Sequence, residues 1–351
     1  MLSIKQNDTI TAGMNTQTAD LSPSESFSME VRTAWRQLPE KPLFFTLLAA
    51  WLALFHFLGN STMGYINTPS LLAWMYDAYS KSGIDGEDGH GMLIPFVVLG
   101  LFWWKKNELL AEKHQKWWPG LLILAGALCL HMLGYVAMQP RISIVGLFVG
   151  IYGLIGMVWG YRWLLKSVFP YFLFCFMVPL GSFTEKATFH LRLFVTWVVE
   201  HLFNDILSIS VVRQGTQLFN GLGTYQFEVA AACSGIRSLV SIFLIATVYG
   251  FIVFRSPFKR FIMMAAGVPL AVIGNVVRLS GIIFAGEFGG QEWGNYVHES
   301  GFFSIVPYIP AILGVMYIGR WLEIMPDRNK AVAIASPEAA ASPTKSEATK
   351  S

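Results

Sequence analysis

Long apolar stretches separated by short polar segments run through most of the 351-residue chain. A helix needs roughly 20 consecutive apolar residues to cross the hydrocarbon core of a bilayer. The pattern therefore predicts an all-α fold, a polytopic membrane bundle of about eight transmembrane helices. The predicted spans lie near residues 43–60, 91–105, 118–138, 142–160, 164–181, 235–254, 261–286 and 301–320.

A further apolar stretch, 188–211, carries five ionisable residues, His190, Arg192, Glu200, His201 and Asp205. Lys and Arg are enriched in cytoplasmic loops. If the N-terminus is cytoplasmic and 188–211 does not cross, most of the 25 basic residues fall on the cytoplasmic side. If 188–211 did cross, one of the basic runs 105–116 and 255–260 would lie outside. We therefore expect an amphipathic helix on the outer surface, or a re-entrant hairpin.

Three regions follow from this pattern. Residues 1–42 are polar and contain no signal-peptide-like segment, so we expect a cytoplasmic N-terminal segment. Residues 43–325 form the membrane domain, in which the GxxxG of Gly146 and Gly150 is expected to let two helices pack closely. Residues 326–351 are rich in Ala, Ser, Pro, Thr and Lys, which predicts a disordered cytoplasmic tail.

The composition agrees with a membrane protein and excludes several other classes. Hydrophobic residues make up 54% of the chain, charged residues 13%, and the mean hydropathy is +0.49, whereas soluble proteins carry about a quarter charged residues. The basic residues form short clusters rather than one stripe, so we expect no nucleic-acid partner. The three cysteines show neither a CxxC pair nor metal-ligand spacing, so we expect no metal and no cofactor. Cys129 and Cys175 lie in mid-span and are expected to be core residues.

The third cysteine, Cys233, lies in the first turn of a predicted span, shortly after Glu228. A helix N-terminus stabilises negative charge and should lower the pKa of this thiol. Arg237 lies four residues on, on the same helical face, and would add to that effect. The alternative is that Cys233 is only a small packing residue at the membrane boundary.

Polar residues in the predicted span 261–286 and in the outer loop after it are expected at the same membrane face as Cys233. Asn275 and Arg278 share one face of their helix, with Arg278 in its outer third, and ionisable residues within a span are functional candidates by default. The alternative is an arginine that reaches for lipid phosphate. His298 lies in the last outer loop. A thiol, a guanidinium and an imidazole would supply the nucleophile, the oxyanion stabiliser and the acid–base group of acyl transfer.

Three motifs in these regions resemble the exosortase/archaeosortase family of membrane cysteine transpeptidases. They are AACSGIRSL at 231–239, GNVVRLSG at 274–281 and VHESGFF at 297–303. The chain departs from the family pattern at Ala231, where many members have an acidic residue. The resemblance implies that the catalytic residues are Cys233, Arg278 and His298. Supporting or substrate-binding candidates are Arg237, Asn275, Glu228, Arg213 and Ser234.

The resemblance also implies a function. Such an enzyme cleaves the C-terminal sorting signal of exported proteins, which consists of a short motif such as Pro-Glu-Pro, a transmembrane helix and a basic cluster. It passes the protein through a thioester to an acceptor, an amine or a lipid group. The expected location is the bacterial inner membrane, with both termini in the cytoplasm and the active site facing the periplasm.

Three other functions compete with this interpretation. An intramembrane cysteine hydrolase would use the same nucleophile without transfer. A transporter would carry polar groups near the midplane of several helices, whereas the early spans hold only His56 and His131, which we expect to satisfy local carbonyls. The third is an assembly factor without catalysis. The chain contains no HExxH and no GxSxG.

Overall fold

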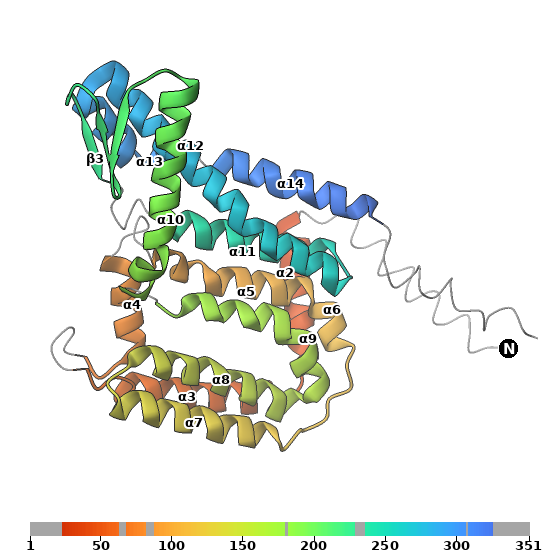
Figure 1. Cartoon of the computed structure of the whole chain (residues 1–351). Coiled ribbons are helices and arrows are strands. Elements are labelled where there is room, and N and C mark those ends of the chain that lie inside the picture. The colour runs from red at the N-terminus through yellow and green to blue at the C-terminus, as the bar shows by residue number, and fades with distance from the viewer. Residues whose placement is uncertain are drawn as a thin grey trace, which may run out of the picture. The chain divides into compact units, whose positions relative to one another are not determined.

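The computed structural model describes residues 23–62, 68–81, 88–179, 182–228, 236–306 and 308–325 (Figure 1). The chain divides into two compact units, Met1–Leu180 and Gly181–Ser351. The first 22 residues and the predicted tail from 326 onward lie outside the described residues, so the predictions made for them stay predictions. Each unit is described by itself.

The first unit is helical throughout its described residues. Its elements are α2 (Pro23–Gln37), α3 (Lys41–Leu58), α4 (Leu71–Lys81), the 3₁₀ helix η1 (Gly89–Met92), α5 (Ile94–Trp104), α6 (Lys106–Leu110), α7 (Gly120–Val136), α8 (Pro140–Trp159), α9 (Tyr161–Phe172) and the 3₁₀ helix η2 (Leu173–Met177). Helices α3, α7 and α8 run alongside one another (Figure 1).

Glycines let α8 approach its two neighbours closely. A Cβ atom on Gly146 would lie 2.8 Å from the carbonyl oxygen of Ala127 in α7, and one on Gly150 would overlap the indole ring of Trp51 in α3. Trp51 also donates a hydrogen bond from Nε1 to the carbonyl oxygen of Leu147, at 3.0 Å. The expectation that the GxxxG permits close packing is confirmed, with each glycine receiving a different helix.

Charged residues gather at one end of the first unit. Lys106 pairs with Glu30 at 2.9 Å, Lys166 pairs with Glu112 at 2.6 Å, and Lys166 Nζ donates to the carbonyl oxygen of Glu108. These residues come from α2, α6, the following loop and α9, which the charge pattern assigns to one membrane side. Helix α4 lies at the other end of the bundle (Figure 1). Which end faces the cytoplasm stays a prediction.

The second unit combines helices with a small sheet. Its elements are α10 (Ser182–His201), the π-helical turn η3 (Leu202–Ile206), β1 (Val211–Gln214), β2 (Gln217–Asn220), β3 (Gln226–Glu228), α11 (Ile236–Val253), α12 (Pro257–Glu299), α13 (Gly301–Ile305) and α14 (Tyr308–Ile324). Helices α11, α12 and α14 share an apolar core that includes Ile242, Ala246, Met263, Leu270, Ala311 and Val315. Lys259 Nζ donates to the carbonyl oxygen of Met325, 2.7 Å away, and so ties the start of α12 to the end of α14.

The described residues are mostly helical, as the all-α expectation required, and one small sheet is added to them. Its three strands are antiparallel in the order β1-β2-β3, and Val211, Leu218 and Phe227 are buried. Strands of three or four residues contain too few alternating positions to stand out in the sequence, and their preference for the strand conformation comes from packing against neighbours. The predicted single element 188–211 is also wrong in extent, because the helix ends at His201 and a strand begins at Val211.

Helix α10 itself fits one of the two alternatives for this segment. It is a continuous helix from Ser182 to His201 rather than a hairpin. In Figure 1 it runs at a steep angle to α11 and α14 rather than alongside them. Its location at the membrane interface stays a prediction.

The described helices support a membrane protein but leave the number of spans open. Three are long and apolar enough to cross a bilayer, Lys41–Leu58, Pro140–Trp159 and Pro257–Glu299. Shorter apolar helices cover Gly89–Trp104, Gly120–Val136 and Leu239–Val253. Two predicted spans are interrupted: α9 contains Pro170 and continues as η2, and α13 ends before α14 begins. The count of eight therefore stays a prediction.

The expectation that Cys129 and Cys175 are core residues is wrong. Both thiols are exposed on the surface of the first unit. An apolar residue of a membrane helix need not face the protein interior, because lipid tails are as apolar as a leucine side chain.

The glycine contacts generate a stability prediction. Gly146→Ala should lower the free energy of unfolding by about 1–3 kcal/mol, because the added methyl group meets backbone atoms of α7 that cannot move aside. The matched control is Gly126→Ala in α7, where nothing lies within 4 Å of the added Cβ. Thermal unfolding in detergent measures both variants. Equal melting temperatures for the two would contradict the proposed packing.

Candidate active site

Helix α12 carries three of the predicted site residues, Asn275, Arg278 and His298. It is continuous from Pro257 to Glu299 except at Gly290, whose φ of 71° and ψ of −171° are not helical. This region of backbone space is open to glycine and strongly disfavoured for any residue with a Cβ atom. The chain therefore bends at Gly290, between Arg278 and His298.

The bend brings His298 back toward Arg278. Twenty positions separate the two residues, and a straight helix would hold them about 30 Å apart. Desolvation lowers the pKa of His298, the positive charge of Arg278 lowers it further, and Glu299 opposes both. Charges much more than about 10 Å apart interact little at physiological ionic strength. The charge of Arg278 therefore acts on the imidazole of His298 across the bend.

The polar groups of α12 lie against an apolar background. The side chain of Asn275 is only 4% exposed, and Arg278 and His298 are half-buried. Leu279, Ile282 and Ile283, which follow Arg278, are buried in a core shared with α10 and the sheet. Such surroundings raise the effective strength of a charge or hydrogen bond at this point of the helix.

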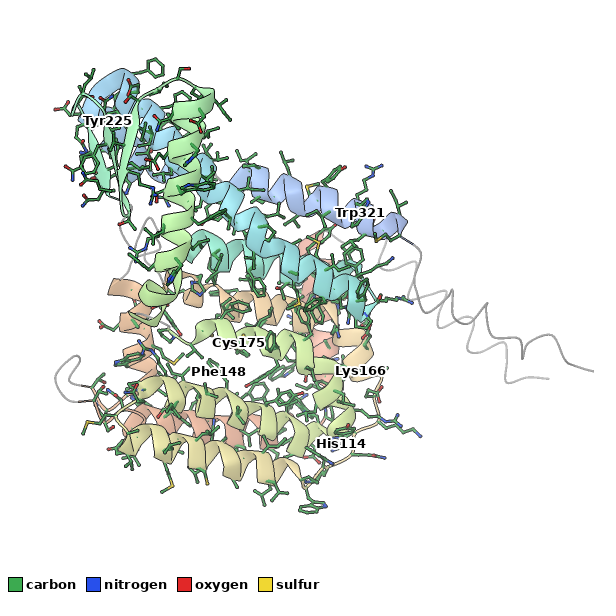
Figure 2. The ribbon with its side chains drawn as sticks, in the orientation of Figure 1. His114, Phe148, Lys166, Cys175, Tyr225 and Trp321 are labelled. Carbon is green, nitrogen blue, oxygen red and sulfur yellow. The ribbon has the colours of Figure 1, made fainter. Side chains whose placement is uncertain are left out.

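The sheet is fixed to α12 on both sides of the bend. Phe227 of β3 fills the space left by Gly286 and Gly294, where an added Cβ would lie 2.7 Å from its ring or overlap it. Asn220 at the end of β2 donates a hydrogen bond from Nδ2 to Oε2 of Glu287, at 2.7 Å. Burial, and then the charge of Glu287, raises the pKa of the nearby Tyr225. Tyr225 directly precedes β3 and is labelled in Figure 2.

Two side-chain amides bond the outer edges of the sheet. Gln291, the residue after Gly290, accepts from the backbone N–H of Gln226 at 2.7 Å and donates to its carbonyl oxygen at 3.0 Å. Asn204 bonds both backbone groups of Val211 in the same way, at 2.8 Å each. Exposed strand edges tend to pair with other chains. Each amide therefore takes the place of a neighbouring strand at one point of its edge.

Arg213 of β1 also helps to hold the sheet in place. Its guanidinium pairs with the carboxylate of Glu200 in α10 at 2.9 Å, and its backbone N–H donates to the same carboxylate. The pair ties β1 to α10. The role predicted for Arg213 in substrate binding stays a prediction.

The other predicted site residues lie at the limit of the described chain. Cys233 and Ser234 lie outside the described residues. Glu228 ends β3 and Arg237 lies in the first turn of α11, but their side chains are outside the described part as well. Both flanking elements are docked on α12: β3 through Phe227, and α11 through the close approach of its backbone at Phe243 to Gly267.

The described residues of the first unit form an apolar cavity, and two of its histidines are hydrogen-bonded to neighbouring groups. Within its described residues, a cavity of about 200 Å³ lies between α8 and the α9–η2 segment and is lined by apolar and aromatic side chains with Cys175; Figure 2 labels Phe148 and Cys175 there. His131 bonds the hydroxyl of Ser143 at 3.2 Å and His56 that of Ser70 at 3.0 Å. His131 also bonds the backbone of Leu58, so the expected carbonyl partner is present there. The partner of His56 is a serine hydroxyl instead.

Sequence reasoning missed Gln291, Asn220 and Phe227, which hold the bend. The pair Gly289–Gly290 was a signal that the predicted span could break there. No sequence signal marks Gln291, because its partner Gln226 lies 65 positions away. Among the described residues, no group of three His, Cys, Asp or Glu side chains could hold a metal ion.

These features define a class: a helical membrane protein in which a small sheet packs on a bent helix that carries an arginine before the bend and a histidine after it. A family model of the transmembrane exosortases matches residues 81–316, about two thirds of the chain. The chain belongs to this family, which confirms the resemblance seen in the three motifs. Neither the curated proteins nor the solved structures contain a significant match.

The proximity of Arg278 and His298 generates a prediction about protonation. The lowered pKa leaves His298 neutral at pH 7. Arg278→Gln removes the positive charge, so the pKa of His298 should rise toward the ordinary value of about 6.5. Titration of the imidazole signals by NMR in detergent measures this, with His298→Asn used to assign the resonance. Arg320→Gln, an exposed arginine of α14, is the control. A pKa of His298 that is identical in Arg278→Gln and wild type would contradict the geometry.

Proposed function

We propose that this exosortase is a membrane cysteine transpeptidase that cleaves a C-terminal sorting signal from exported proteins and transfers them to an acceptor. The observation that carries the proposal is the bend at Gly290, through which the charge of Arg278 reaches His298. Family membership supports the reaction class. The site residues follow from the sequence motifs together with this geometry.

Cys233 is the proposed nucleophile. The elements before and after it, β3 and α11, are both docked on α12, the helix of Arg278 and His298. Ile236, the first residue of α11, lies three positions after Cys233, and three extended steps of the chain reach at most about 10 Å. The chain connectivity thus supports a thiol in the same region as the guanidinium and the imidazole.

In the proposed reaction, neutral His298 accepts the thiol proton of Cys233, and the thiolate attacks the scissile carbonyl carbon. Arg278 donates hydrogen bonds to the oxygen that becomes negative in the tetrahedral intermediate. The intermediate collapses to a thioester as the C–N bond breaks, and His298 passes its proton to the leaving amine. An acceptor nucleophile then attacks the thioester while His298 takes up its proton, and the thiol of Cys233 is regenerated.

The remaining candidates have supporting roles in this proposal. Asn275 is buried three residues before Arg278 and is suited to orient the guanidinium. Arg237 and Glu228 lie in elements that border Cys233, and Ser234 follows it directly. Arg213 acts from β1, where its pair with Glu200 fixes its position.

The proposed orientation places both termini in the cytoplasm and the site at the periplasmic face of a bacterial inner membrane. The substrate is then an exported protein whose signal ends in a transmembrane helix and a cytoplasmic basic cluster. Hydrolysis without transfer uses the same nucleophile and differs only in the acceptor. The mass of the released product separates the two, because hydrolysis adds one water and transfer adds the acceptor.

A cysteine series tests the nucleophile. Cys233→Ala should reduce processing of a co-expressed sorting-signal protein by on the order of 10⁴-fold or more, because loss of a nucleophile removes the covalent route. Cys129→Ala and Cys175→Ala are matched controls and should process normally. Immunoblots of substrate and product measure processing, and membrane fractionation checks that each variant is inserted.

A direct test is to trap the intermediate. Mass spectrometry of the wild-type protein should locate a substrate fragment linked as a thioester to Cys233. Normal processing by Cys233→Ala, or an adduct on another cysteine, would refute this assignment.

A further inference from the structure

The geometry points to Gln291 as a positioning residue of this site: by bonding β3, it fixes the direction in which α12 continues after the bend, and so holds His298 opposite Arg278. This inference rests on the proposed function for its catalytic consequence. The positioning itself depends only on the fold.

The bend is held by contacts on each side of Gly290. Before it, Glu287 accepts the hydrogen bond from Asn220 at 2.7 Å. After it, Gln291 makes its two hydrogen bonds to the backbone of Gln226. The ring of Phe227 packs at both Gly286 and Gly294. Strand β3 and the end of β2 therefore contact the helix on both sides of the bend.

The distances make small errors at the bend important. His298 lies two turns beyond Gln291, about 10 Å along the helix axis. A rotation of about 10° at Gly290 would therefore move the imidazole by about 2 Å. Misplacement of a catalytic group by about 1 Å can cost about 100-fold in rate. Glycine resists such a rotation less than any other residue, so the resistance must come from contacts outside the helix.

The carboxamide of Gln291 is suited to this task. It offers one acceptor oxygen and an NH₂ group with two donors. Besides its bond to Gln226, Nε2 donates a hydrogen bond to Oδ1 of Asn295 at 3.0 Å. The bond to the backbone of Gln226 is independent of the side chain at that position. The bond thus fixes Gln291 relative to the strand itself, and the bond to Asn295 extends this hold by one turn toward His298.

Loss of Gln291 should leave the fold intact. The sheet is also held by the apolar core of Val199, Phe203, Leu218, Phe227 and Ile283. Asn220 and Glu287 still bond on the other side of the bend. The hydrogen bonds of Gln291 therefore fix the direction of α12 after Gly290, while burial of apolar side chains holds the sheet against α12.

Two variants of the full-length protein test the inference. Gln291→Ala removes the side chain, and Gln291→Met keeps its length but makes no hydrogen bonds, so it serves if the alanine variant folds poorly. Gln214→Ala is the matched control, because Gln214 is exposed in the same sheet and the described contacts include no side-chain hydrogen bond to it. Size-exclusion chromatography and thermal unfolding in detergent show whether each variant is folded.

The first measurement is the pKa of His298 by NMR, with Arg278 and Glu299 as the charges that act on it. In Gln291→Ala and Gln291→Met the imidazole moves away from Arg278, so its pKa should rise toward that of an ordinary histidine. The second is the rate of substrate processing, which should fall by about 10- to 100-fold. Gln214→Ala should match wild type in both.

The inference is overturned if a folded Gln291 variant matches wild type in either quantity. The proposed function can fail separately. If wild type processes no sorting-signal protein, or if Cys233→Ala processes it normally, the transpeptidase assignment is wrong. The pKa of His298 still decides in that case whether Gln291 positions it.

Discussion

A single glycine with a positive φ, Gly290, determines the direction of the last turns of α12. A helix that carries Arg278 and His298 at a spacing of twenty residues would keep them far apart if it were straight. The non-helical backbone of Gly290 changes the direction of the last part of α12. The positive charge of Arg278 then acts on the imidazole of His298. The role proposed for Arg278 and His298 in one reaction requires this bend.

The bend in turn depends on the three-stranded sheet, which would not be stable without the helices around it. Three strands of three or four residues bury too little apolar surface to be stable by themselves. They gain their core from α10 and from the face of α12 around Leu279 and Ile283. In return the sheet supplies Phe227 and the backbone of Gln226 to α12. The sheet and the bent helix α12 therefore stabilise each other.

The first unit illustrates a different constraint, imposed by packing between apolar helices. Without a hydrophobic driving force between helices in lipid, close contact of backbones matters more. Gly146 and Gly150 give α8 this contact with α7 and α3, while ion pairs such as Lys166 with Glu112 join the loops at one end. Exposed Cys129 and Cys175 show that this packing leaves apolar residues on the outside.

The sequence by itself determined the membrane class, most helix positions and the family, because long apolar runs and the motifs around Cys233, Arg278 and His298 are local signals. It also placed Asn275 and Arg278 on one helical face. Only the tertiary structure decided that Val211–Glu228 forms a sheet, that α12 bends at Gly290, and that Gln291 bonds a strand 65 positions earlier. The physical reason is the range of the interactions. Helix and span formation depend on neighbouring residues, whereas these strands and the bend exist through contacts between distant segments, which no local pattern records.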